Sequence, residues 1–241
     1  MDTRSEQVLR DLAPGGKLRF AINYGNPVLA QRDPSGHPKG ISVDLARELC
    51  HHLGVEPEFI TFDAAGKVFA AIESGAWDVA FLARDPVRAK QILFTPPYVI
   101  IEGSYLVKSE SQFQHIDDLD QPGVRIAVGK GAAYDLYLTR ALKRATLVRA
   151  ETSAGAIELF QAEGLEAAAG VRQPLQEIAT LRADLRVIPG RFTTIEQAMG
   201  TLAGREVGHQ FLVDFIAEMK ASGFVASALL HHGEKTAQVA P

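Results

Sequence analysis

Strand and helix patterns alternate along almost the whole chain, and this alternation limits the possible folds more than any other feature. LRFAIN at 18–23 indicates a strand of mixed apolar character, and the short apolar run WDVAFL at 77–82 is typical of a strand that is buried in a parallel sheet. Between them lie segments with apolar residues at helical spacing, for example Leu45, Leu49 and Leu53. The alternation predicts an α/β fold.

The pattern of strands and helices occurs twice. After the first set, a second begins with a strand at 124–128 and a helix that carries Tyr134, Leu138 and Leu142. Two βαβ sets joined by extended segments indicate two lobes, and α/β proteins usually bind ligands in a cleft at such a place. We therefore predict a two-lobed protein with a ligand cleft between the lobes.

Two local signals concern the starts of helices. Ser42 is expected to cap the helix that follows it, because a serine hydroxyl can accept a hydrogen bond from a free helical N–H. The turn Gly129–Lys130–Gly131 follows a strand and opens a helix, and Glu151 comes about twenty residues later, which is the outline of a dinucleotide-binding fingerprint. Tyr134 stands at the third glycine position, where its bulk opposes close packing, so we reject this reading.

Bulk composition excludes several classes. The net charge of −4 argues against non-specific binding of nucleic acid, which requires a basic face. No apolar run approaches the roughly 18 residues of a membrane helix. The single cysteine, Cys50, lies in a helical apolar pattern and is expected to be a buried core thiol. No metal-ligand spacing and no nucleophile motif is present, so we expect no metal and no cofactor.

Four motifs follow one another along the chain: GISVDLARELCHHLGV at 40–55, FAAIESGAWDVAF at 69–81, DPVRAKQILFTPPY at 85–98 and IDDLDQPGVRIAVGKGAAYDLYL at 116–138. In this order they resemble the family 3 extracellular solute-binding proteins, which have the type II periplasmic binding fold and are best known for amino-acid uptake. The similarity runs from about Leu18 to Phe224, nearly the whole chain.

The resemblance implies a division of the chain and a set of partners. One lobe would contain residues 1–101 and 196–241, and the other the inserted residues 102–195. Closure on the ligand would bend the connecting strands near 101–104 and 195–198. The expected partners are a small-molecule anionic ligand and an ABC permease, and the protein is expected to be a monomer.

The resemblance also implies the ligand contacts. Arg88 stands where the signature arginine of the family grips the ligand carboxylate with its two-donor fork; an exposed arginine at a helix start is the alternative. The turn Gly131–Ala132–Ala133 is expected to offer free N–H groups at a helix start, which favour an anion. The full set of expected ligand-binding residues is Asn26, Lys67, Ala83, Arg84, Arg88, Lys130, Ala132, Ala133 and Arg172.

One departure from the family pattern concerns the ligand. Amino-acid binders place an aspartate for the ligand ammonium where this chain reads Val171–Arg172–Gln173. We therefore predict a small organic acid, able to carry two anionic groups, held between Arg88 and Arg172. If Val171 rather than Arg172 faces the cleft, the second positive clamp is absent. Either way, an ordinary α-amino acid is disfavoured.

Two other roles remain open. The same fold hosts a dehydratase acting on prephenate-like acids, which requires a general acid; Glu196 is the candidate here, although we expect it to pair with an arginine. The N-terminal residues MDTRSEQVLRDLAPGGK show no apolar secretion signal. The family resemblance implies the periplasm if a leader lies outside this sequence. Otherwise the protein would stay in the cytoplasm as a ligand-sensing module.

Overall fold

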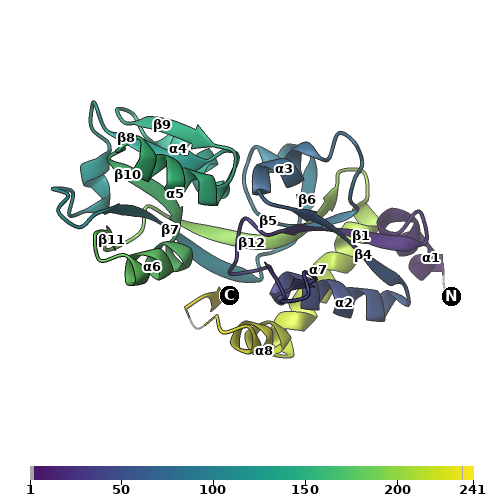
Figure 1. Ribbon diagram of the computed structural model, residues 1–241. Helices are drawn as coiled ribbons and strands as arrows, with labels where there is room; N and C mark the ends of the chain where they lie inside the picture. Colours follow the sequence, from purple (N-terminus) through teal and green to yellow (C-terminus); the bar gives the residue numbers. More distant parts are fainter. Residues whose placement is uncertain (1–2, 235) are drawn as a thin grey trace. The chain divides into compact units, whose positions relative to one another are not determined.

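The computed structural model describes residues 3–234 and 236–241 (Figure 1). The chain forms two compact units. Unit 1 contains Met1–Asp63, Lys67–Ile100 and Glu196–Pro241, and unit 2 contains Ala64–Gly66 and Ile101–Ile195. Two long strands, β7 (Val99–Lys108) and β12 (Thr193–Leu202), each continue from one unit into the other. Among the described residues, no helix combines the length and the apolar character needed to cross a membrane.

The sheet of unit 1 has the strand order β4, β1, β5, β12. The first three strands are parallel, with Phe20 opposite both Phe59 and Val79, and β12 is antiparallel to β5. Two short strands add to it, β6 on β12 and β13 on β7. The bounds are β1 (Lys17–Asn23), β4 (Glu56–Phe62), β5 (Val79–Ala83), β6 (Ile92–Phe94) and β13 (Gln238–Val239), with a separate hairpin of β2 (Gln31–Arg32) and β3 (Pro38–Lys39).

The sheet of unit 2 has the order β7, β10, β8, β9, with β11 also paired to β7. Strand β10 is antiparallel to β7 and parallel to β8, and β8 is parallel to β9. The core of this unit consists of alanines and leucines around one aromatic side chain, that of Phe160, which is fully buried. The bounds are β8 (Arg125–Gly129), β9 (Thr146–Ala150), β10 (Ala167–Val171) and β11 (Leu185–Val187).

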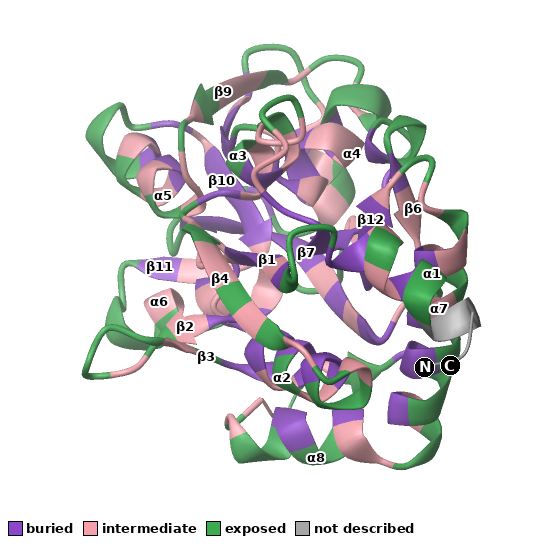
Figure 2. Cartoon of the chain, turned by 90° about the vertical axis from the view of Figure 1, so that its right-hand side faces the viewer, coloured by how far each residue is buried: buried purple, intermediate pink, exposed green. Residues whose placement is uncertain are grey.

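The helices follow the strands in the order expected of an α/β protein, so the predicted fold class is confirmed. Helix α2 carries buried residues on one side and exposed ones on the other. Buried (purple) and exposed (green) residues are both seen along it in Figure 2. The bounds are α1 (Thr3–Leu12), α2 (Ile41–Leu53), α3 (Ala65–Ala70), α4 (Ala133–Ala141), α5 (Ser153–Ala162), α6 (Arg172–Leu181), α7 (Glu206–Ala221) and α8 (Phe224–His231), with short 3-10 turns η1 (Arg88–Lys90) and η2 (Ile116–Leu119).

Helix α2 begins earlier than the sequence predicts. Its N-cap is Gly40, with φ 118° and ψ 171°, and Ser42 lies inside the helix, so the prediction that Ser42 caps it is wrong. The backbone N–H of Ser42 donates instead to the carbonyl of Leu29, at 3.1 Å. The close approach of the Leu29 backbone requires a residue without Cβ at position 40.

Asp78 fixes three elements of unit 1 to one another. Its side chain is fully buried and accepts hydrogen bonds from Arg19 Nε at 2.8 Å and from Arg205 Nη1 at 3.0 Å. The hydroxyl of Thr201 donates to the Asp78 carbonyl at 2.8 Å. One residue therefore connects β1, the start of β5, and the segment from β12 to α7.

Cys50 is buried, which confirms the prediction of a core thiol. Burial, with a smaller contribution from the charge of Glu56, raises the pKa of the Cys50 thiol to about 12. Because only a thiolate attacks a disulfide reagent, we expect no reaction with Ellman's reagent at about pH 8 in the folded protein. One equivalent should react after unfolding in urea. Rapid reaction before unfolding would contradict this burial.

Candidate functional site

Arg88 lies in the loop that follows β5, in the first residue of η1, and only 1% of its surface is exposed. The alternative of an exposed arginine is therefore wrong. Its guanidinium Nη1 donates to the carbonyl of Ala83, the last residue of β5, at 2.9 Å. Burial lowers the pKa of Arg88 to about 10, an effect that the charge of Asp85 opposes. Arg88 therefore stays positively charged at neutral pH.

Arg84, from the same loop, has a different environment. It forms an ion pair with Glu196, with 3.1 Å between Nη1 and Oε2, and about half of each side chain is exposed. The backbone N–H of Arg84 also donates to the carbonyl of Glu196, at 2.9 Å. The expectation that Glu196 pairs with an arginine is confirmed.

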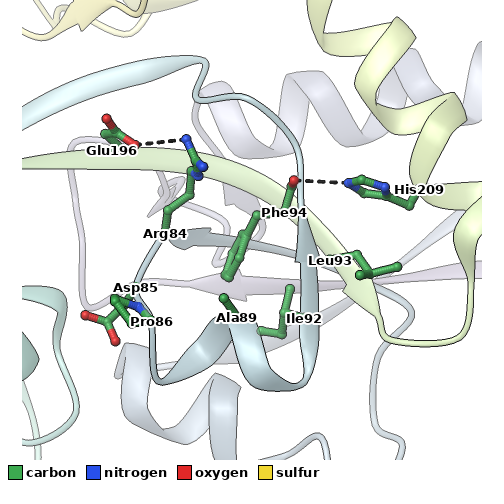
Figure 3. A pocket seen from close by; sticks show the side chains of 9 residues that line it. All are labelled: Arg84, Asp85, Pro86, Ala89, Ile92, Leu93, Phe94, Glu196 and His209. Atoms are coloured by element: carbon green, nitrogen blue, oxygen red, sulfur yellow. Dashed lines mark hydrogen bonds and ion pairs between the residues drawn. The ribbon is translucent and has the colours of Figure 1, made fainter.

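The Arg84–Glu196 pair borders an open pocket of about 500 Å³ in unit 1, shown in Figure 3. At its other end, the ring nitrogen Nε2 of His209 lies 3.0 Å from the carbonyl oxygen of Phe94. Between the two polar ends the lining is mainly apolar. The lining residues are Arg84, Asp85, Pro86, Ala89, Ile92, Leu93, Phe94, Glu196 and His209. Arg88 is not among them, so this pocket and the buried guanidinium are separate features of the loop.

The other two expected residues of unit 1 differ in exposure. Asn26 is 8% exposed, and its Oδ1 has no hydrogen-bond partner among the described residues. Lys67 is exposed and pairs with Asp63, one helical turn earlier, at 2.8 Å. With about half of its side chain exposed, Lys67 contacts solvent as well as Asp63.

In unit 2 the turn before α4 is less open than expected. The N–H of Gly131 donates to Asp135 Oδ2 at 2.8 Å, and the N–H of Ala132 donates to the carbonyl of Gly129 at 3.0 Å. Arg149 Nε binds the other oxygen of Asp135 at 3.0 Å. The expectation that this turn offers free donors is thus wrong for these two groups, because the protein supplies its own acceptors. Ala133 is the first residue of α4.

Lys130, in the same turn, lies 3.6 Å from Glu151, and both side chains are largely exposed. A pair this exposed contributes little to stability. The Lys130 side chain is largely in contact with solvent.

Arg172 is the first residue of α6, directly after β10 ends at Val171. Its Nε lies 2.7 Å from Oε2 of Glu102, and its Nη2 donates to the carbonyl of Gly190. The other oxygen of Glu102 lies 2.5 Å from Nη1 of Arg191. Burial opposes ionisation of Glu102, but hydrogen bonds from Arg191 and Arg172 keep the pKa of its carboxyl below the ordinary value.

The next residue, Gln173, is 9% exposed, and within the described chain its Oε1 has no hydrogen-bond partner. A buried amide oxygen without a donor is costly, so a bound molecule that donates to it would be favoured. The sequence interpretation did not select Gln173, Glu102 or Arg191. Glu102 had a detectable signal, since it is a lone acid inside the apolar strand sequence VIIEGSYLV.

The expected site residues thus form separate groups. Ala83 ends β5, and Arg84 and Arg88 lie in the loop that follows it, whereas Asn26 and Lys67 come from other parts of unit 1. Lys130, Ala132 and Ala133 share a turn of unit 2, and Arg172 belongs to a cluster around Glu102. In the described part of the chain, no group of three or more histidine, cysteine or acidic side chains is placed to hold a metal ion.

Comparison with known proteins gives one family over most of the chain. A sequence model of the bacterial extracellular solute-binding proteins, family 3, matches residues 18–232. L-cystine-binding protein TcyJ of Escherichia coli is 24% identical over 223 residues, which cover 90% of this chain and 83% of TcyJ. Cyclohexadienyl dehydratase of Pseudomonas aeruginosa is 25% identical over 148 residues, covering 59% of this chain and 54% of the enzyme. The curated relatives are matched over 43% to 83% of their own length.

Among solved structures, a mutant of ArgBP from T. maritima superimposes with a TM-score of 0.81 at 19% identity, covering 95% of this chain and 100% of that one. Similarity at this identity establishes the fold alone. The expected type II periplasmic binding fold is confirmed.

Proposed function

This chain belongs to the bacterial extracellular solute-binding proteins of family 3, and from that premise we propose that it captures a small organic acid through Arg88. An ABC-type uptake system is the proposed setting, with a permease as the protein partner. Ligand capture without chemistry is the role that most members of such a family share, and the finer identity of the ligand depends on the site residues.

The state of Arg88 carries the proposal. A guanidinium that is 1% exposed and still charged at neutral pH is costly to keep in a folded protein. Its fork of parallel donors matches a carboxylate better than any other common ligand group. A carboxylate ligand would add acceptors and negative charge to those that Ala83 and Asp85 already provide to this buried cation, so ligand binding would stabilise its charge further.

The segment at 171–173 supports a ligand without an ammonium group. Its residues are Val171, Arg172 and Gln173, none of which is acidic. The carboxylate of Glu102 does lie beside Arg172, but it is already shared by two arginines. The local charge is therefore positive rather than negative, which disfavours a cationic group there.

Titration calorimetry with a set of small carboxylates tests the proposal. For the acid that binds, Arg88→Ala should raise the dissociation constant about 100-fold, because hydrogen bonds to a charged group contribute roughly 1.5–3 kcal/mol. Arg88→Lys keeps the charge but removes the fork, and it should recover only part of this loss. Arg182→Ala is the matched control, since this exposed arginine pairs with Asp184 in unit 2. Full affinity in Arg88→Ala would overturn the proposal.

An α-amino acid is the second candidate ligand, and one observation favours it. The unpartnered Oε1 of Gln173 would accept a hydrogen bond from an ammonium group, and relatives such as TcyJ are named for amino-acid ligands. Alanine and propionate form a matched pair that differs by the amino group alone. Tighter binding of propionate supports the organic acid, and tighter binding of alanine supports the amino acid.

Catalysis is not part of the proposal, although one relative is a dehydratase. The candidate general acid, Glu196, is half-exposed and shares its carboxylate with Arg84. A general acid must direct its carboxyl toward the reacting group, whereas the Glu196 carboxylate is directed toward the guanidinium of Arg84.

A further inference from the structure

Glu102 joins three segments of unit 2 through its two carboxylate oxygens. It lies in β7, one residue beyond the point at which this strand enters the unit. Arg172, at the start of α6, binds Oε2 at 2.7 Å, and Arg191, just before β12, binds Oε1 at 2.5 Å. About a third of the Glu102 side chain is exposed, compared with 19% for Arg172 and 55% for Arg191. We refer to these three residues as the Glu102 cluster.

The Glu102 cluster limits what Arg172 can offer to another molecule. Its Nε is held by Glu102 and its Nη2 by the carbonyl of Gly190. Among the described residues, Nη1 has no hydrogen bond, so one nitrogen of the three remains for a further acceptor. A second carboxylate on a ligand would need a two-donor fork for strong binding. Arg172 cannot present that fork while Glu102 holds it.

The charge of the cluster also weakens the binding of a second ligand carboxylate to Arg172. Two arginines and one ionised glutamate leave a single positive charge, and the negative member lies next to the arginine that a ligand would approach. Replacing the carboxylate by an amide would raise the net charge to two and would weaken the hold on Nε. Both changes would favour a ligand with an additional negative group.

We propose that Glu102 is a specificity-determining residue that lowers the affinity of unit 2 for dicarboxylates relative to monocarboxylates. The inference rests on the proposed function, because it requires that the protein binds organic acids and that Arg172 faces them. Glu102 acts through Arg172 rather than by touching the ligand, so it is a positioning residue. It also narrows the expected ligand from an acid with two anionic groups to one with a single carboxylate.

The test compares straight-chain monocarboxylates and dicarboxylates of matched carbon number by titration calorimetry. In Glu102→Gln the preference for monocarboxylate over dicarboxylate should fall about tenfold, which is the effect expected of one unit charge at roughly 10 Å and an effective dielectric constant near 20. A structural role alone would weaken both ligands equally and leave this ratio unchanged. An unchanged ratio in a folded variant would overturn the inference.

Two further variants keep the test decisive. Glu166→Gln removes an acid that pairs with Arg125 elsewhere in unit 2, and the ratio should not change. Arg191→Gln removes a positive charge at an exposed position and should shift the ratio toward monocarboxylates, opposite to Glu102→Gln. Arg191→Gln remains informative even if Glu102→Gln fails to fold. An unchanged ratio in Arg191→Gln would then overturn the inference. If the wild-type protein binds neither class of acid, the proposed function falls as well.

Discussion

Replacing Asp78 with asparagine should lower the free energy of unfolding by about 3–5 kcal/mol, because removing one partner of a buried charge network leaves the others uncompensated. Asparagine has nearly the same shape, so the loss would come from charge and hydrogen bonding rather than from a cavity. The charge of Arg205 would lose the most stabilisation, because only 20% of its side chain is exposed to water. The side chain of Arg19 is 34% exposed and can gain hydrogen bonds to water.

Differential scanning calorimetry provides the measurement. For a chain of this size each kcal/mol corresponds to roughly 2–4 °C, so the melting temperature should fall by about 10 °C. Asp184→Asn is the matched control, because Asp184 also binds an arginine, Arg182, but both side chains are exposed. The control should have the same melting temperature as the wild-type protein. Equal melting temperatures for all three proteins would show that the Asp78 network contributes nothing to stability.

The second large effect is expected at Gly40, the N-cap of α2. Its φ of 118° and ψ of 171° lie in a region that is essentially restricted to glycine, and occupying it costs another residue of order 1–3 kcal/mol. A Cβ here would also collide with the Leu29 carbonyl and would lie 2.9 Å from Ala30 Cα. Both obstacles are backbone atoms, which cannot rotate away. Gly40→Ala should therefore lose about 4 kcal/mol in total, or fail to fold.

Urea unfolding followed by the fluorescence of Trp77, the single tryptophan, measures this change in unit 1. Gly36→Ala is the control from the same region. Gly36 also has a positive φ, of 86°, but a Cβ added there would meet nothing within 4 Å, so a loss of about 1 kcal/mol is expected. Similar losses for the two variants would mean that dihedral strain, and not the contact with Leu29 and Ala30, determines the cost.

Elements with a strong local pattern were predictable from the sequence. The apolar run at 77–82 corresponds to β5, and the spacing of Tyr134 and Leu138 corresponds to α4. The start of α2 was not predictable, because Ser42 belongs to a residue type that is a good N-cap in isolation. The approach of the Leu29 backbone, which selects Gly40, is a tertiary contact that no local pattern contains.

The same distinction applies to the candidate site. Arg88 was found because the motif around it is contiguous in the sequence, and the structure then adds that it is buried and charged. The Glu102 cluster was missed because its members come from three separate segments, at 102, 172 and 191. Likewise, Asp135 satisfies the donor of Gly131 only once the turn has formed. Charge balance at a site depends on such long-range pairs, and it cannot be read from one segment.

The continuous course of β7 and β12 has a consequence for how the chain is made. Synthesis proceeds from the N-terminus, so β1, β4 and β5 leave the ribosome first, yet β5 must wait for its antiparallel neighbour β12. All of Ile101–Ile195 is produced in between, and its own strands β7 to β11 can pair without any later residue. The inserted unit is therefore complete while the edge of β5 is still open, and the unit that starts the chain is the last to close.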